Sequence, residues 1–364
     1  MIIQVEMCIY DILCLFLFVL FCFQYKTRIK DAKAFYWGVA AILFVMCFKS
    51  SNTGEGLGDL QGYVNLYLGK ASMYDSDDVE PGLKFLCLCL HFLPISEFIF
   101  ITFTTLLIMC PIFWGIKNYS QNKTYSLMLL FALQGVWLVV YIAMRQALAQ
   151  AFILSAIFVF FNRDKIKKWK IYTIALMIVS SFFHSTPYII IPLALGAFFI
   201  PENKKYLYIA LIVSLLLSST VYIFLADTFL SYFGNISQIS RVTSYIEDET
   251  YGMDSGYNIL NYAPLTILAL AMVYYNNISQ KNVYFLKAFV MGVVIYNLLG
   301  NIPLVNRAVC FFFVLGLVGA VPKIKGNRQF AAMAILILYF IWRNYVHFAE
   351  GTHSAYLPYH FIWE

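Results

Sequence analysis

Charged residues are scarce in this sequence. Asp, Glu, Lys and Arg make up 12% of its 364 residues, whereas 62% are hydrophobic and the mean hydropathy is +0.75. A typical soluble domain is about 25% charged. This composition excludes a soluble globular domain and predicts an all-α polytopic membrane protein, with the lipid bilayer as its solvent.

Several signatures are absent. The basic residues are scattered among loops, and the sequence has no RNA-binding motif and no zinc-ligand spacing, so we expect no nucleic-acid partner, metal or cofactor. The eight cysteines lie in or beside apolar runs, and the spacing of Cys87 and Cys89 fits neither a metal site nor a redox site. We expect them to act as small hydrophobic residues without disulfides. The first apolar run lacks a basic flank and a small-residue cleavage site, which predicts a retained span.

About twelve apolar segments are candidate membrane spans, since a span needs about 20 apolar residues. Leu83–Pro94 is too short to cross and is predicted to be re-entrant or interfacial. We expect one integral membrane domain over residues 1–364, with outer loops at 50–84 and 227–258. The predicted spans are Met7–Phe23, Ala34–Phe48, Phe98–Ile116, Tyr125–Ala143, Gln146–Phe161, Ile171–Phe183, Pro187–Ile200, Tyr206–Ala226, Ile259–Tyr275, Val283–Leu299, Ala308–Val321 and Phe330–Phe348.

The basic residues also predict the orientation. Alternating turns hold 18 of the 25 Lys and Arg residues, and among the acidic residues only Asp31, Asp164 and Glu202 share that side. Because loops rich in Lys and Arg stay in the cytoplasm, both termini and both long polar loops are expected outside.

The early outer loop contains a polar and aromatic pattern. Asp59, Tyr63 and Tyr67 are four residues apart, so they would share one face of a helix. Glu80 precedes Pro81, a usual first-turn residue, and therefore marks the start of a second helix. Capping is the alternative role for Asp59 and Glu80, and interfacial anchoring for the tyrosines.

Three arginines are exceptions on the outer side. Arg145 lies between two apolar runs with no acidic neighbour in the sequence, and Arg241 and Arg307 lie in or beside other outer loops. Either these side chains extend to the membrane interface, or they bind an anion, because guanidinium grips phosphate oxygens with two donors. Three outer arginines without matched carboxylates suggest a diphosphate ligand, whereas Lys49 and Lys84 fit interfacial anchors.

The remaining candidates are a histidine and a tyrosine. His184 precedes Ser185-Thr186 at a helix end, where it could stabilise a turn, bind phosphate or remove a proton from a sugar hydroxyl. Tyr245, like Tyr63 and Tyr67, could stack on sugars.

Taken in order, these residues resemble the EpsG-like group of Wzy-type polysaccharide polymerases over nearly the whole chain. The resemblance rests on Asp59-x3-Tyr63-x3-Tyr67, Glu80-Pro81-Gly82, Arg145-Gln146, His184-Ser185-Thr186 and Arg307 ahead of a late span.

The resemblance implies a membrane glycosyltransferase of GT-C-like fold at the outer face of a bacterial plasma (inner) membrane. Such an O-antigen polymerase transfers a growing undecaprenyl-diphosphate-linked glycan onto the next lipid-linked repeat unit. The implied partners are undecaprenyl-diphosphate-linked oligosaccharide repeat units and membrane lipids, with a chain-length regulator as a further candidate. The chain has no nucleotide-sugar motif in a cytoplasmic loop, which agrees with a lipid-linked donor.

Residue roles follow from the chemistry of this reaction. The leaving diphosphate needs positive charge, for which Arg145, Arg241 and Arg307 are candidates, with Gln146 beside the first of them. His184, Asp59 and Glu80 are the candidates for the base.

Other functions remain open. An O-antigen ligase shares the donor, but the modest early loop favours a polymerase. A polysaccharide flippase or transporter would place ionisable residues at mid-membrane depth. A membrane acyltransferase would need a histidine on the cytoplasmic side.

Overall fold

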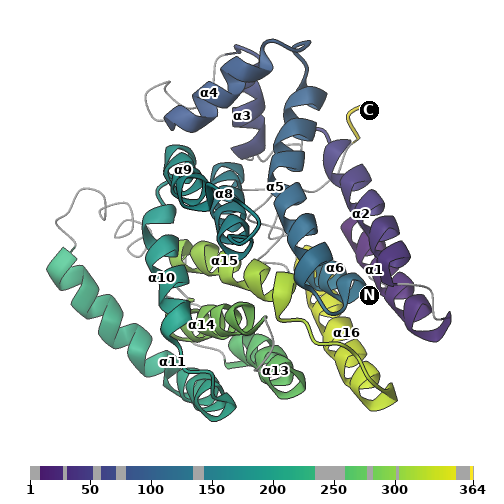
Figure 1. Ribbon diagram of the computed structural model, residues 1–364, viewed down its shortest axis with the longest axis vertical. Helices are drawn as coiled ribbons and strands as arrows, with labels where there is room; N and C mark the ends of the chain where they lie inside the picture. Colours follow the sequence, from purple (N-terminus) through teal and green to yellow (C-terminus); the bar gives the residue numbers. More distant parts are fainter. Residues whose placement is uncertain are drawn as a thin grey trace. The chain divides into compact units, whose positions relative to one another are not determined.

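The computed structural model describes residues 9–27, 31–51, 59–70, 79–133, 143–233, 259–276, 282–300, 303–349 and 361–363. The regular elements in these ranges are α-helices, and one isolated antiparallel bridge joins Lys49 to Phe361. The prediction of an all-α protein is confirmed. Figure 1 shows the helices, which are α1 (Ile9–Thr27), α2 (Asp31–Cys47), α3 (Asp59–Tyr67), α4 (Pro81–Leu90), α5 (Glu97–Tyr119), α6 (Lys123–Ala132), α8 (Met144–Phe161), α9 (Trp169–Phe183), α10 (Pro187–Phe199), α11 (Lys204–Phe233), α13 (Ile259–Tyr275), α14 (Val283–Leu299), α15 (Pro303–Gly319) and α16 (Asn327–Ala349).

The chain is a membrane-embedded protein. Among the described residues, four helices are long and apolar enough to cross a bilayer, namely α1, α5, α8 and the Asn327–Val346 part of α16. Five shorter apolar helices accompany them, including α4 and α9. The expected count of about twelve spans is not confirmed by these lengths. The short α4 agrees with the prediction that this segment does not cross the membrane.

Most helix boundaries lie close to the predicted apolar segments. Helices α13 and α14 coincide with the predicted spans Ile259–Tyr275 and Val283–Leu299. Helix α11 differs, because it continues to Phe233 and so takes up the first residues of the predicted outer loop 227–258. The outer loop 227–258 stays a prediction, since polar residues such as Asp227 do not by themselves end a helix and a helix can continue beyond the membrane. The early loop 50–84 contains α3, and α4 begins at Pro81 as predicted.

The chain forms two compact units, which we describe separately. The first comprises Met1–Ile191 and Ile324–Glu364, and the second comprises Pro192–Lys323. In the first unit α8 packs against α5 and α9, α6 packs against α1 and α2, and α4 packs against α9 (Figure 1). In the second unit α14 packs against α11, α13 and α15. A single integral membrane domain over residues 1–364 stays a prediction.

Close packing in the second unit depends on small residues. A Cβ atom added to Gly316 would lie 2.2 Å from the ring of Phe289, and one added to Gly319 would lie 2.2 Å from the ring of Phe285. Small residues allow α15 to approach α14 in this way, as is usual where helices pack within a membrane.

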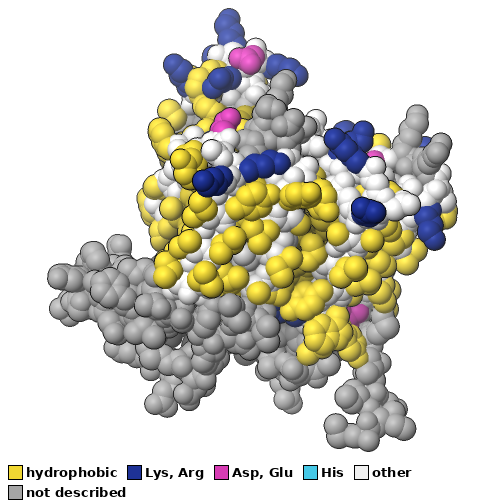
Figure 2. All heavy atoms as spheres, turned by 90° about the horizontal axis from the view of Figure 1, so that it is seen from below, with side chains coloured by type: hydrophobic (Ala, Val, Ile, Leu, Met, Phe, Trp, Pro, Cys, Tyr) yellow, Lys and Arg dark blue, Asp and Glu magenta, His cyan; other side chains and the backbone are white. Residues whose placement is uncertain are grey.

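Many large hydrophobic side chains lie on the surface. Ile171, Ile174 and Ile178 of α9 are exposed, as are Phe85, Leu88 and Phe92 in and just after α4. Figure 2 shows one face of the molecule, on which many hydrophobic side chains are exposed. A surface of this kind is stable in contact with lipid rather than water.

Candidate active site

The site begins where α4 starts. Pro81 occupies the first turn of α4, and Glu80 is the N-cap residue with φ −59° and ψ 142°. The Glu80 side chain makes no capping hydrogen bond to α4. Its carboxylate instead pairs with the guanidinium of Arg145, at the start of α8. The capping role that the sequence left open for Glu80 is therefore not the one that its side chain takes.

Tyr63 of α3 completes this cluster. The Nε atom of Arg145 donates a hydrogen bond to the Tyr63 hydroxyl at 2.9 Å, and the guanidinium carbon lies 5.4 Å from the centre of the Tyr63 ring. The Arg145 and Glu80 side chains are 20% and 26% exposed, whereas Tyr63 is 2% exposed. Three segments far apart in the sequence thus hold one guanidinium at a position that solvent still reaches.

This geometry corrects one inference from the sequence. The outer arginines were expected to lack matched carboxylates, but Arg145 is paired with Glu80, 65 residues away. The pair carries no net charge. The orientation of Arg145 is fixed because a partly buried carboxylate and a phenol hydroxyl both accept hydrogen bonds from it.

A close contact between α4 and α9 supports the cluster. A Cβ atom at Gly82 would lie 2.7 Å from the carbonyl oxygen of Phe182 in α9, a distance that side-chain atoms do not tolerate. Phe183 in turn stacks on Phe152 of α8, with 5.2 Å between ring centres. The start of α4, the end of α9 and the middle of α8 therefore pack together, and this packing supports the position of Glu80 next to Arg145.

Two predicted binding residues are buried. Tyr67 is 0% exposed and stacks on Phe100 with 5.1 Å between ring centres, while its carbonyl oxygen lies 2.9 Å from Nε2 of His91. Gln146 is 2% exposed, and among the described residues its Nε2 atom has no hydrogen-bond partner. Tyr63 and Tyr67 present no ring face on which a sugar could stack in this structure.

His184 lies in the turn between α9 and α10. The backbone N–H of Thr186 donates to Nδ1 of His184 at 3.0 Å, and the Thr186 hydroxyl lies 3.2 Å from the same nitrogen. Because Nδ1 accepts the backbone bond, the proton of the neutral ring is on Nε2. In this tautomer Nε2 can donate a hydrogen bond but cannot act as a base. The contacts of Nδ1 with Thr186 stabilise the turn, which is one of the roles expected from the sequence.

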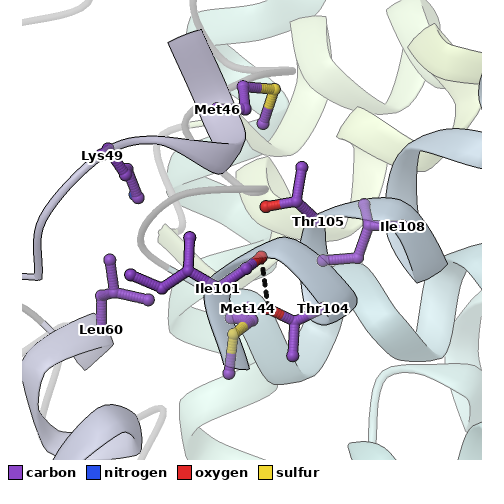
Figure 3. A pocket seen from close by; sticks show the side chains of 8 residues that line it. All are labelled: Met46, Lys49, Leu60, Ile101, Thr104, Thr105, Ile108 and Met144. Atoms are coloured by element: carbon purple, nitrogen blue, oxygen red, sulfur yellow. Dashed lines mark hydrogen bonds between the residues drawn. The ribbon is translucent and has the colours of Figure 1, made fainter. Parts of the chain in front are cut away.

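Lys49 is a residue whose environment the sequence did not reveal. It was expected to be an interfacial anchor, but it is only 9% exposed and lines a cavity of about 20 Å³, large enough for one water molecule. Figure 3 shows this cavity, to which α3 contributes Leu60, α5 contributes Thr104 and Thr105, and α8 contributes Met144. Burial lowers the pKa of Lys49 well below its usual value, and the nearby Glu97 carboxylate offsets part of that effect.

The other predicted site residues are placed only in part. Arg241 and Tyr245 lie outside the described residues, as does the side chain of Asp59, which begins α3 one turn before Tyr63. Arg307 is exposed on α15 in the second unit. The structure therefore brings together Tyr63, Glu80 and Arg145.

A protein-family model, that of the EpsG family, matches residues 35–361. The chain belongs to the EpsG family. This family includes Wzy-like polymerases, and the matched region contains every candidate residue from Asp59 to Arg307. The resemblance drawn from the sequence is confirmed. No curated protein and no solved structure matches the chain. Membership of the EpsG family indicates a membrane protein of polysaccharide biosynthesis with a glycan polymerase-like function and lipid-linked glycans as its general class of substrate.

Proposed function

We propose that this EpsG family protein is a Wzy-type polysaccharide polymerase with a GT-C-like helical fold. It transfers a growing undecaprenyl-diphosphate-linked glycan onto the next lipid-linked repeat unit at the outer face of a bacterial plasma membrane. The observation that carries the proposal is the Tyr63–Glu80–Arg145 cluster, in which a carboxylate and a phenol hydroxyl hold a partly exposed guanidinium. The asymmetry of Lys and Arg between alternating turns supports the outer location.

The reaction requires a hydroxyl of the acceptor sugar to attack the anomeric carbon of the donor. A new C–O bond forms, the C–O bond to the diphosphate breaks, and the lipid diphosphate leaves with the electron pair. The proton of the acceptor hydroxyl passes to a base. The step is accelerated by positive charge fixed at the departing diphosphate oxygens.

Arg145 is proposed to supply that charge. A planar guanidinium can hold a carboxylate with one edge and a phosphate oxygen with another, so the pairing with Glu80 orients Arg145 without preventing phosphate binding. Because the Arg145–Glu80 pair is neutral overall, it does not balance a diphosphate by itself. We therefore retain Arg241 and Arg307 as further proposed phosphate ligands.

The structure changes the order of the candidate bases. The Glu80 carboxylate is engaged with Arg145, and Nδ1 of His184 accepts from the Thr186 backbone. Asp59 begins the helix that carries Tyr63 and is one turn before it in the sequence. We propose Asp59 as the base and His184 as a hydrogen-bond donor to the substrate through Nε2.

The test compares Arg145, at the start of α8, with Arg163, just after the end of α8. The purified protein, reconstituted in lipid, is given undecaprenyl-diphosphate-linked repeat units, and the products are separated by length. We expect the wild-type protein and Arg163→Ala to produce a ladder of lengths, and Arg145→Ala to leave single repeat units. Arg163 is a matched control because it also lies over a ring, that of Phe160, at 5.2 Å.

Three outcomes oppose the proposal. Unchanged ladders from Arg145→Ala would mean that Arg145 is an interfacial anchor. Transfer of single units onto an added non-repeat acceptor, without ladders from the wild-type protein, would favour a ligase. A flippase would give translocation in vesicles and no change in glycan length.

A further inference from the structure

An apolar groove runs between α5 and α8 in the first unit. Two adjoining hollows form it, with volumes of about 330 and 370 Å³, and both are lined by Cys110 and Pro111 of α5 and Ser155 of α8. Each volume lies within the range of small-molecule sites, about 300–1,000 Å³. Because the hollows share these three residues, they form one continuous groove.

The groove is lined by small and by aromatic side chains. The three residues that the hollows share are small, and the Ser155 hydroxyl donates to the carbonyl oxygen of Ala151 at 2.8 Å within its own helix. Its polar hydrogen is therefore satisfied, and this shared segment behaves as apolar surface. Aromatic rings, including those of Phe152 and Trp114, also line the groove. A groove lined by small and aromatic residues fits an extended, methyl-branched hydrocarbon chain.

Two of the residues that line the groove lie on the side of α8 that carries Arg145. Phe152 and Val159, which line the groove, follow Arg145 at intervals of seven residues, which is close to two helical turns. With a rise of 1.5 Å per residue, the groove begins at Ala151, about 9 Å from Arg145, and extends about 17 Å along α8 to Asn162. This length is about half of the 30 Å thickness of the hydrocarbon core of a bilayer.

We infer that the α5–α8 groove binds the isoprenoid tail of the lipid diphosphate whose phosphates Arg145 holds. The inference rests on the proposed function for the identity of the lipid. A guanidinium about 9 Å beyond one end of an apolar groove, which extends through about half of the hydrocarbon layer, is complementary to an anionic head group on a long apolar tail. The groove thereby fixes the donor lipid along α8 while its diphosphate meets the Tyr63–Glu80–Arg145 cluster.

Two native cysteines allow a direct test. Cys110 lines the groove and Cys89 lies on α4, and both are exposed. The wild-type protein in detergent is treated with a lipid-soluble alkylating reagent, and modification of each cysteine is followed by peptide mass spectrometry. Undecaprenyl diphosphate without sugar is the probe, and phosphatidylglycerol at the same concentration is the control lipid.

We expect undecaprenyl diphosphate to slow alkylation of Cys110 at least fivefold and to leave Cys89 unchanged. In Arg145→Ala, protection of Cys110 should require a higher concentration of the same lipid. Equal protection by phosphatidylglycerol would show that the groove holds bulk lipid, and an unchanged Cys110 rate would show that the groove is not the tail site. Either result overturns the inference.

A second variant tests the groove during turnover. Ser155→Phe places a bulky ring in the segment that the two hollows share, about ten residues along α8 from Arg145. Its control is Ile174→Phe on the exposed face of α9. We expect Ser155→Phe to raise KM about tenfold for the undecaprenyl donor and to leave KM unchanged for a donor with a geranyl-length tail. Equal KM changes for both donors would contradict the tail site. Because Cys110 protection is read without turnover, a protein that binds the lipid but forms no polymer would refute the proposed function and leave the groove assignment intact.

Discussion

The contact between Gly82 and Phe182 gives a sharp test of how the site is positioned. Gly82→Ala adds a single methyl group 2.7 Å from the Phe182 carbonyl oxygen and 3.1 Å from Cδ2 of Phe183. Ordinary van der Waals contact begins at 3.4 Å, so α4 and α9 must separate by about 0.7 Å. A backbone carbonyl at a helix end cannot move aside as a flexible side chain does.

The expected effects follow from this displacement. Overpacking of this kind costs about 1–3 kcal/mol, and the better helix propensity of alanine returns about 1 kcal/mol, so we expect a net loss of up to about 2 kcal/mol. Glu80 is two residues from Gly82 and moves with it, away from Arg145. Because misplacing a catalytic group by about 1 Å can cost a factor of about 100, we expect polymerisation to fall at least tenfold.

The matched control is Gly196→Ala in α10. No atom lies within 4 Å of a Cβ at this position, so this variant should keep wild-type activity and gain up to about 1 kcal/mol from helix propensity. Thermal unfolding in detergent and the reconstituted polymerisation assay measure both quantities. If Gly82→Ala matched Gly196→Ala in stability and product length, the close approach of α4 and α9 would not position the site.

Two further predictions concern charges in the first unit. In a double-mutant cycle of Glu80→Gln and Arg145→Gln, we expect a coupling free energy of about 2 kcal/mol, because a partly buried charge-assisted hydrogen bond contributes about 1.5–3 kcal/mol. Additive losses of stability would contradict the pairing. Lys49 has a lowered pKa in the folded protein, so the unfolded chain binds more protons between the two pKa values and the free energy of unfolding rises with pH there. Lys49→Met should reduce this rise in the free energy of unfolding, measured by thermal melts from pH 6 to pH 10. An equal pH dependence in the variant and the wild-type protein would contradict the burial of Lys49.

The sequence by itself determined the helical elements and the polar landmarks. Runs of apolar residues bounded by charged turns located α13 and α14 to the residue, because a membrane helix is specified by local composition and length. Pro81 fixed the start of α4, since its ring suits the first turn of a helix and its missing N–H costs nothing there. The ordered set of residues from Asp59 to Arg307 was also sufficient to recognise the family, because those residues keep their order and spacing along the chain.

Only the tertiary structure decided what these residues do to one another. Arg145 meets Glu80 and Tyr63 across 65 and 82 residues, and nothing in the local sequence of Arg145 indicated a carboxylate partner. Lys49 resembled an ordinary anchor until the packing of α3, α5 and α8 around it showed that it is buried. Helical periodicity states which residues share a face, but the partner of that face depends on how helices pack, and packing joins residues that are far apart in sequence. The pairing of Arg145, the burial of Lys49 and the groove between α5 and α8 all arise at that level.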